Sequence, residues 1–284
     1  DYVPIEVHWS EVPGRDEAWK EATIRNTSPE QFQQEFECEF LGSVNTLISP
    51  AKIKNMAFKT PITSNAGLDV FEDPKKDKTY VCTVDVARGV SKDYSAFVIM
   101  DVTQMPFKVV AKYRNNDIKP LLFPHTIERV CKAYNHAHIL VETNDLGQQI
   151  AEALQFELEY DNLLMTTNRG RAGQILGAGF SGRGAGFGVK MTKQIKKIGC
   201  ANIKTLIESD KIFINDFNIV EEMSTFVKRG QSWQAEEGNT DDLMMCLVIF
   251  GWLSNQPFFK EMTDTNARQM LYDEQQALIE QDMA

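Results

Sequence analysis

Short runs rich in apolar and β-branched residues follow one another from about residue 78. Three of them, at residues 79–87 (TYVCTVDVA), 95–103 (SAFVIMDVT) and 108–114 (KVVAKYR), are joined by short turn-like pieces. Runs of this length and composition, separated by so few residues, are typical of neighbouring strands that reverse direction. The pattern therefore predicts an antiparallel meander of three strands.

Helical and strand patterns alternate after this meander. Residues 122–135 repeat apolar positions at helical spacing, and the apolar run at 137–145 (AHILVETND) is typical of a buried strand. Further on, the sequence predicts a helix at 147–158, a glycine-rich loop at 170–188, a basic helix at 190–208, a short strand at 211–215, and helices near 218–228 and 241–254. This order predicts an α/β fold of the RNase H-like (RuvC/integrase) type, a mixed sheet with helices on both faces.

The first 60 residues have a different texture and predict a helical linker. A helix is expected from about Asp16 to Ile24, and a second one opens at Ser28, where Ser28 can act as N-cap and Pro29 as first helical residue. Phe32, Phe36 and Phe40 then repeat every four residues on one stripe, which is typical of a packing face. We expect a linker at 1–60, a main domain at 61–260 and an acidic C-terminal tail at 261–284.

Composition narrows the class of protein. The chain has 284 residues, of which 43% are hydrophobic and 25% charged, and none of its apolar runs reaches the roughly 18 residues of a membrane span. Its five cysteines stand singly, mostly in apolar runs, which favours buried free thiols over disulfides or a zinc site. The start of the chain has neither an initiator Met nor the order of a signal peptide, so we expect it to continue a longer chain.

Acidic residues adjoin or interrupt apolar runs at three sites. Asp85 lies inside the first predicted strand, Glu142 ends the fourth, and Asp241 and Asp242 open the last apolar helix. Burying a lone carboxylate costs several kcal/mol unless something pairs with it. If the first and fourth strands are neighbours, Asp85 and Glu142 lie side by side, and the start of the last helix brings a third carboxylate to them.

A divalent cation would make such a cluster tolerable. Like charges brought together raise one another's pKa and destabilise the fold unless a cation neutralises them. Oxygen ligands without nearby His or Cys suit Mg²⁺ or Mn²⁺, and two such ions can support phosphodiester hydrolysis. Taken singly, these acids also fit roles without a metal, because Glu142 can be a surface residue and Asp241 or Asp242 a helix cap.

At these residues the chain resembles the nuclease domain of a tailed-phage terminase large subunit, closest to the T-even type. The resemblance is carried by VDVARGVSKDYSAF, ILVETNDLGQQIAEAL and EEGNTDDLMMCLVIFGWL, with QFQQEFECEFLGS similar to the segment that joins the family's ATPase and nuclease domains. It implies an endonuclease that cuts concatemeric double-stranded DNA during genome packaging, in the cytoplasm of the infected host. The implied partners are double-stranded DNA, an ATPase domain absent from this sequence, the portal and the small terminase subunit, with no membrane.

The same resemblance assigns the catalytic, metal-binding acids to Asp85, Glu142 and one of Asp241 and Asp242. Related RNase H-like resolvases carry an acid directly before a small apolar run, as Asp242 stands before LMMC, so we favour Asp242 as the ligand. Asp241 is then a helix cap or a second ligand. Thr240 stands where relatives often have His.

Glycines and basic residues surround residues 169–197. GAGFSG at 177–182 matches a dinucleotide-binding pattern, but the flanking strand and helix that such a fold needs are not predicted, and GAGFGVKM lacks the Gly and Ser or Thr of a P-loop. The net charge of −10 argues against a nucleic-acid binder with a wholly basic surface, yet it leaves room for a local basic groove. Candidate DNA contacts are Arg88, Lys92, Arg169, Arg171, Arg183 and Lys190.

Two other functions fit the same pattern. A RuvC-like junction resolvase would share the acids but prefer branched DNA and dimerise. A non-catalytic packaging or docking module would use the acids only as caps and solvated surface.

Overall fold

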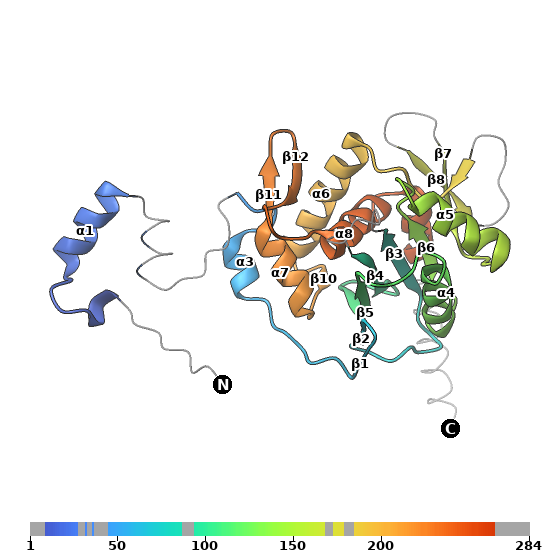
Figure 1. Cartoon of the computed structure of the whole chain (residues 1–284), viewed down its shortest axis with the longest axis horizontal. Helices are drawn as coiled ribbons and strands as arrows, with labels where there is room; N and C mark the ends of the chain where they lie inside the picture. The colour runs from blue at the N-terminus through green and yellow to red at the C-terminus, as the bar shows by residue number, and fades with distance from the viewer. Residues whose placement is uncertain are drawn as a thin grey trace, which may run out of the picture.

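Strands β3 (Tyr80–Asp85), β4 (Ser95–Asp101) and β5 (Phe107–Asn115) form the centre of a seven-stranded sheet (Figure 1). The computed structural model describes residues 9–27, 32, 36, 45–86, 94–167, 173–178 and 185–264. β3 pairs antiparallel with β4, and β4 with β5, so the predicted meander is confirmed.

The remaining strands extend this centre on both sides. β6 (His138–Val141) pairs parallel with β3, while β2 (Leu68–Val70) pairs with β5 and β1 (Thr63–Asn65) with β2. The short β10 (Ile212–Phe213) runs parallel to the start of β5. The strand order β1-β2-β5-β4-β3-β6 mixes parallel and antiparallel pairs, as the RNase H-like prediction requires.

Alternate residues of the central strands face two separate cores. Val81 of β3 and Val98 of β4 belong to one core, whereas Cys82 and Phe97 belong to the other. Successive side chains of a strand point to opposite faces, so a sheet with near-continuous apolar strands is buried on both sides.

Helices cover both faces. On the first face, α8 (Asp242–Leu253) packs on β3 and β4, with α6 (Lys193–Glu208) and α7 (Phe217–Thr225) against it. On the second face lie α4 (Phe123–Ala133), α5 (Gly147–Glu152) and its π-helical continuation η2 (Ala153–Glu157) (Figure 1). All twelve residues of α8 are buried, which explains why it is apolar around its whole circumference.

Two glycines bring α6 and α8 into close contact. A Cβ on Gly199 would lie 2.3 Å from the carbonyl oxygen of Val248, and one on Gly251 would lie 2.3 Å from that of Gly199. The helix backbones therefore approach more closely than any larger residue at these two positions allows.

The structure corrects the prediction for the glycine-rich stretch. Its described parts contain β8 (Gln174–Ala178) and β9 (Ala185–Phe187), which pair with β7 (Leu164–Thr167) in a three-stranded sheet rather than forming a loop throughout. A hairpin of β11 (Phe226–Arg229) and β12 (Ser232–Ala235), also absent from the prediction, precedes α8. Both β7–β9 and β11–β12 are short, and glycine or polar residues interrupt the alternation that identifies strands.

The N-terminal segment carries its own aromatic cluster. It contains η1 (Trp9–Glu11) and α1 (Glu17–Asn26), where Asp16 accepts a capping hydrogen bond from the backbone N–H of Trp19. Trp9 and Trp19 stack with ring centroids 6.1 Å apart, and Phe36 packs edge-on against Trp19. The predicted first helix is confirmed, whereas Phe40 and most of the second helix lie outside the described residues.

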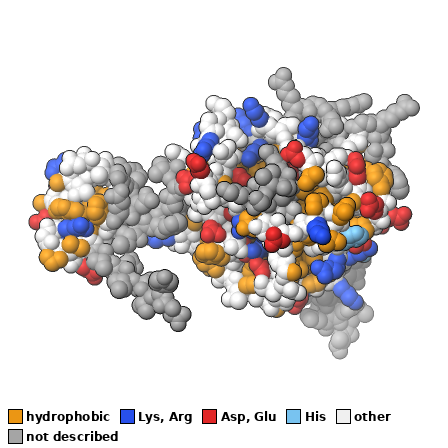
Figure 2. All heavy atoms as spheres, viewed as in Figure 1, with side chains coloured by type: hydrophobic (Ala, Val, Ile, Leu, Met, Phe, Trp, Pro, Cys, Tyr) orange, Lys and Arg blue, Asp and Glu red, His pale blue; other side chains and the backbone are white. Residues whose placement is uncertain are grey.

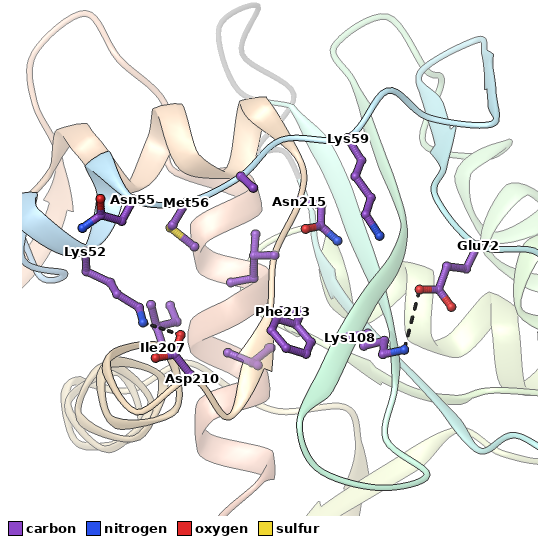
Figure 3. A pocket seen from close by; sticks show the side chains of 13 residues that line it. Lys52, Asn55, Met56, Lys59, Glu72, Lys108, Ile207, Asp210, Phe213 and Asn215 are labelled. Atoms are coloured by element: carbon purple, nitrogen blue, oxygen red, sulfur yellow. Dashed lines mark hydrogen bonds and ion pairs between the residues drawn. The ribbon is translucent and has the colours of Figure 1, made fainter.

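Short α3 (Pro50–Lys54) borders a cavity of about 690 Å³ (Figure 3). Lys108, at the start of β5, lines this cavity. It pairs with Asp101 at the end of β4, and Asp101 pairs with Tyr80 at the start of β3. The cavity is thus at the end of the sheet opposite Asp85. Two of its lysines meet acids, because Lys52 pairs with Asp210 and Lys108 lies 3.9 Å from Glu72.

Charges and cysteines agree with the composition. Acidic and basic side chains are interspersed over the face shown in Figure 2. Cys82, Cys131, Cys200 and Cys246, the cysteines within the described ranges, are all buried free thiols. None of the described helices combines the length and the apolar character needed to cross a bilayer.

Candidate active site

Asp85 is the last residue of β3, at the edge of the sheet and only half-buried. This differs from the sequence interpretation, which placed it inside the strand because apolar residues flank it on both sides. Residues 81, 83 and 85 share one face of β3, and Val81 lies in the core covered by α8. The Asp85 side chain therefore lies on the α8 face of the sheet.

Glu142 directly follows β6 and lies beside Asp85. Val84 pairs with Val141 in the parallel ladder, and the backbone N–H of Glu142 donates to the carbonyl oxygen of Val84 over 2.9 Å. Leu140, two residues earlier, belongs to the α8-side core, so Glu142 has the same orientation as Asp85. Two adjacent parallel strands thus end in carboxylates on one face.

Glycines on both sides allow this close backbone packing. A Cβ on Gly147 would lie 1.8 Å from the carbonyl oxygen of Glu142, and one on Gly188 would lie 2.3 Å from that of Val141. Gly188 also has φ +71°, a conformation that favours glycine. The chain around Glu142 is therefore confined by backbone contacts that no other residue permits at positions 147 and 188.

Asp241 and Asp242 reach the site from the start of α8. Asp242 is the first helical residue and is buried, and it accepts the backbone N–H of Tyr94 over 3.3 Å. Asp241 occupies the N-cap position, yet its side chain makes no capping hydrogen bond. It accepts the N–H of Ala235 in β12 over 3.1 Å instead, so Asp241 occupies the expected cap position but its carboxylate does not cap the helix.

A cavity of about 360 Å³, which we call the acid pocket, joins these residues. Five carboxylates line it, together with the cation Lys196 of α6 and the amide of Asn144: Asp85, Glu142, Asp145, Asp241 and Asp242. Asp145 was not predicted as a site residue, and Lys196 was expected only as part of the basic helix at 190–208. Asp145 stands three residues after Glu142 in the sequence, and that short spacing was the signal available for it.

The acids repel one another. The loss of hydration in the pocket raises the pKa of Asp85 well above its ordinary value, and the charges of Glu142, Asp242 and Asp241 raise it further, while Lys196 opposes them. A carboxyl group with such a pKa is destabilised in its ionised form. A bound cation would reverse that effect.

The donor set matches a hard divalent cation, since the pocket offers carboxylate and amide oxygens and no His or Cys. Among the described residues, no three His, Cys, Asp or Glu side chains are already arranged to hold a metal ion together. Ion binding would therefore have to draw the carboxylates closer together than they lie here.

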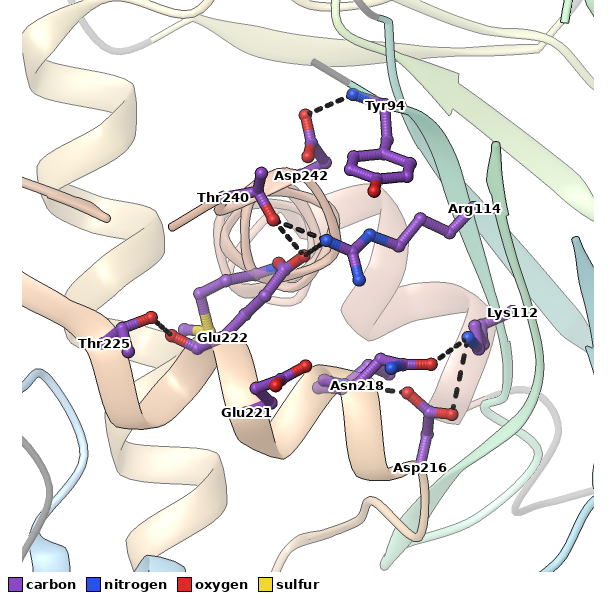
Figure 4. Close-up of polar contacts among 12 residues, drawn as sticks. Tyr94, Lys112, Arg114, Asp216, Asn218, Glu221, Glu222, Thr225, Thr240 and Asp242 are labelled. Atoms are coloured by element: carbon purple, nitrogen blue, oxygen red, sulfur yellow. Dashed lines mark hydrogen bonds and ion pairs between the residues drawn. The ribbon is translucent and has the colours of Figure 1, made fainter. Parts of the chain in front are cut away.

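A buried polar network holds the start of α8 (Figure 4). Glu222 of α7 accepts the backbone N–H of Met244 over 2.8 Å and lies 3.4 Å from the guanidinium of Arg114. Arg114 also donates to Thr240 over 2.5 Å and stacks over the ring of Tyr94, with 4.0 Å between Cζ and the ring centroid. Because the N–H of Tyr94 bonds Asp242, the network connects the helix start to the carboxylate in the pocket.

Burial raises the pKa of Glu222 to about 8, and the charges of Asp242 and Asp241 contribute to the rise. The N–H of Met244 and the guanidinium of Arg114 act against it. Thr240, which directly precedes Asp241, donates to Glu222 over 3.3 Å. Sequence reasoning assigned no role to Arg114, Glu222 or Tyr94. Arg114 and Glu222 lie in none of the runs that carry the resemblance, and Tyr94 lies in one of them without a feature that marks it as a site residue.

Five of the six predicted DNA contacts lie outside the described residues: Arg88, Lys92, Arg169, Arg171 and Arg183. Lys190 is described; it is exposed and lines a second cavity that shares Asn144 and Asp145 with the acid pocket.

Comparisons with known proteins agree with this architecture. A family model described as the terminase RNase H-like domain matches residues 82–256. That range begins in β3 and ends just after α8, so it spans Asp85, Glu142, Asp241 and Asp242.

Solved structures show the same fold. The large terminase nuclease from thermophilic phage G20c with bound magnesium has a TM-score of 0.55 at 19% sequence identity, covering 74% of this chain and 97% of that one. The large terminase nuclease domain of Thermus phage P74-26 has a TM-score of 0.51 at 16% identity, covering 72% and 93%. Structures of the G20c nuclease with bound cobalt and with bound zinc are also similar to this chain.

Proposed function

Because this chain belongs to the terminase RNase H-like domain family, we propose that it is a metal-dependent endonuclease that cuts double-stranded DNA during phage genome packaging. The observation that carries the proposal is the acid pocket, in which five carboxylates face one lysine at the meeting point of β3, β6 and α8. Without a bound cation such a cluster lowers the stability of the fold, because the clustered carboxylates raise one another's pKa.

We assign Asp85, Glu142 and Asp242 as the ligands of Mg²⁺ or Mn²⁺, with Asp241 as an additional ligand. Two divalent ions held there would supply an activated water and stabilise the leaving oxygen of the phosphodiester. The ions bound in the G20c nuclease structures support a divalent requirement.

The chain's own groups keep the ligands in place and receive the substrate. The N–H groups of Tyr94 and Ala235 orient Asp242 and Asp241, respectively. Lys196 is the one cation on the pocket wall among the described residues, and its charge favours a phosphate approaching the acids. Its side chain also lies over the ring of Phe226, 5.6 Å from the centroid, which restrains it.

The wider assignment follows from the family. We infer a largely sequence-independent cut of concatemeric DNA in the infected host's cytoplasm, with the ATPase domain, the portal and the small terminase subunit as partners. We also propose that the chain is most similar to the T-even type. We propose that it divides into a linker at 1–60, a nuclease domain at 61–260 and a tail at 261–284.

A plasmid assay tests the function. Supercoiled DNA incubated with the protein should be nicked and linearised in Mg²⁺ or Mn²⁺ and left intact in EDTA. Linear duplex should be cut as readily as a four-way junction of the same sequence. Strong preference for the junction would favour a RuvC-like resolvase, and intact plasmid in both metals would favour a non-catalytic docking module.

A further inference from the structure

A second cavity, of about 520 Å³, adjoins the acid pocket; we call it the side cavity. Its wall shares Asn144 and Asp145 with the acid pocket and continues over Thr143, Gln148, Thr166 and Lys190. A chain-like ligand whose reacting group lies at the acids would therefore extend into this cavity.

Hydrogen bonds make the floor of the side cavity rigid. The Asn144 amide bonds the backbone of Met191 twice, accepting its N–H over 3.1 Å and donating to its carbonyl oxygen over 3.2 Å. Thr166 donates to the carbonyl oxygen of Gly188 over 2.7 Å. The Asn144 bonds tie the segment after β6 to the segment after β9, and the Thr166 bond ties β7 to that same segment, so the cavity is preformed.

One residue of the side-cavity wall belongs to an aromatic pair. Phe187 of β9 lines the cavity, and the ring of Phe156, outside the cavity lining, meets it nearly at right angles, with centroids 5.5 Å apart. Phe156 is 66% exposed and lies in the π-helical turn η2, a type of turn found frequently at functional sites. An apolar ring held by a second ring, yet open to solvent, is free to stack on a flat ligand.

We propose that the side cavity binds the DNA strand next to the cleaved phosphate in single-stranded form, with a phosphate near Lys190 and an unpaired base stacked on Phe156, whose ring packs against Phe187 of the cavity wall. This inference rests on the proposed nuclease function and names the form of its substrate. Neutral polar groups, one exposed cation and an exposed aromatic ring are the components of single-strand sites. Asp145, at the boundary with the acid pocket, repels phosphate, so the backbone lies on the Lys190 side.

The stacked base has a consequence for the substrate. In an intact duplex every base is stacked on its neighbours, and a base reaches Phe156 only if the strand is locally unpaired. Nicked, gapped or frayed DNA should therefore bind better than an uninterrupted duplex.

Binding in EDTA tests this without any cleavage. Fluorescence anisotropy would compare a single-stranded oligonucleotide with the intact duplex of the same sequence for wild type, Phe156→Ala and Phe156→Trp. Phe156→Ala should weaken single-strand binding about tenfold and duplex binding less than twofold, while Phe156→Trp keeps both. Lys190→Gln should weaken binding of both DNAs and lower the salt slope by about one.

Phe217→Ala is the matched control. Phe217 is 58% exposed and meets Phe58 edge-on with centroids 5.4 Å apart, but neither of these two rings lines the side cavity, whereas Phe187, the partner of Phe156, does. The Phe217→Ala protein should bind both DNAs as wild type does. If Phe156→Ala weakens the binding of single strand and duplex equally, or weakens neither, the single-strand subsite is overturned. If the wild-type protein does not cut plasmid in the presence of metal, the nuclease function is overturned instead.

Discussion

The Asp85 carboxylate is held among other carboxylates by backbone geometry rather than by attraction. The β3–β6 ladder fixes it beside Glu142, and the first turn of α8 brings Asp242 to the same pocket. Since its pKa is raised, its ionised form opposes folding in the absence of metal.

Asp85→Asn should therefore have opposite effects on stability and activity. In EDTA at pH 7 we expect the free energy of unfolding to rise by on the order of 1 kcal/mol, because one repelling charge is removed. Cleavage in Mg²⁺ should fall at least about 100-fold. Urea denaturation and plasmid nicking measure the two effects.

Asp77→Asn is the control for that substitution, since Asp77 is exposed ahead of β3, at the strand end away from the pocket. It should change neither quantity. An Asp85→Asn protein that is less stable in EDTA, or that retains most of its nuclease activity, would contradict the assignment.

Asp241 and Asp242 differ in their surroundings although both line the pocket. Asp242 is buried at the first helical position and raises the pKa of Asp85 more than Asp241 does. Asp242→Asn should therefore weaken Mn²⁺ binding more than Asp241→Asn, by about tenfold or more, when each is titrated calorimetrically. The reverse order would make Asp241 the principal ligand.

At the scale of the elements, α8 owes its position to contacts made by two other helices. Glu222 of α7 accepts the backbone N–H of Met244 in the first turn of α8. Helix α6 crosses α8 where Gly199 and Gly251 meet. The start of the helix is thus fixed from the side and along its length, which keeps Asp242 over the sheet edge.

Glu222 should make stability depend on pH. Its pKa rises from 4.5 in the unfolded chain to about 8 in the fold. Between these values the folded state binds more protons, so the free energy of unfolding falls as pH rises from about 5 to 8. Glu222→Gln, measured by urea denaturation in EDTA, should reduce this fall by on the order of 2 kcal/mol.

Glu221→Gln serves as the neighbouring control because Glu221 is exposed on the same helix. Its pH profile should match that of wild type. Parallel profiles for Glu222→Gln and wild type would show that the Glu222 carboxyl is not kept protonated by burial.

Gly251→Ala should loosen the α6–α8 crossing. The new Cβ would lie 2.3 Å from the carbonyl oxygen of Gly199 and 2.9 Å from the N of Ile203, so one helix must move. Overpacking of this kind costs about 1–3 kcal/mol, which differential scanning calorimetry would record as a lower Tm. Gly186→Ala, whose Cβ meets nothing within 4 Å, should leave Tm within about 1 °C of wild type if contact is the cause.

At the scale of the whole molecule, a net charge of −10 must coexist with binding to a polyanion. Charges of both signs are interspersed on the face in Figure 2, so DNA affinity has to come from a local basic region rather than from the overall field.

Replacing Arg169, Arg171 and Arg183 together by Ala should test where that region is. If the three contact phosphates, DNA binding weakens and its logarithmic salt slope falls by up to about three, with metal affinity unchanged. Lys75 and Lys76 are exposed ahead of β3, at the opposite end of that strand from Asp85, and replacing both should leave the slope unaltered. An unchanged slope in the triple variant would exclude these arginines as phosphate contacts.

Local pattern by itself determined the order of elements and the candidate acids. The apolar runs of β3, β4 and β5, the helical spacing in 122–135 and the apolar run of α8 are properties of neighbouring residues, so they can be read from the chain. The β7–β9 and β11–β12 strands escaped detection because their short, glycine-rich or polar runs form strands only when paired. Tertiary structure alone decided that Asp85 ends its strand, that Asp241 bonds Ala235 rather than capping α8, and that Asp145 and Lys196 join the acids. The physical reason is that these features depend on which distant backbones meet, as at Gly147, Gly188, Gly199 and Gly251, and a one-dimensional pattern contains no such distances.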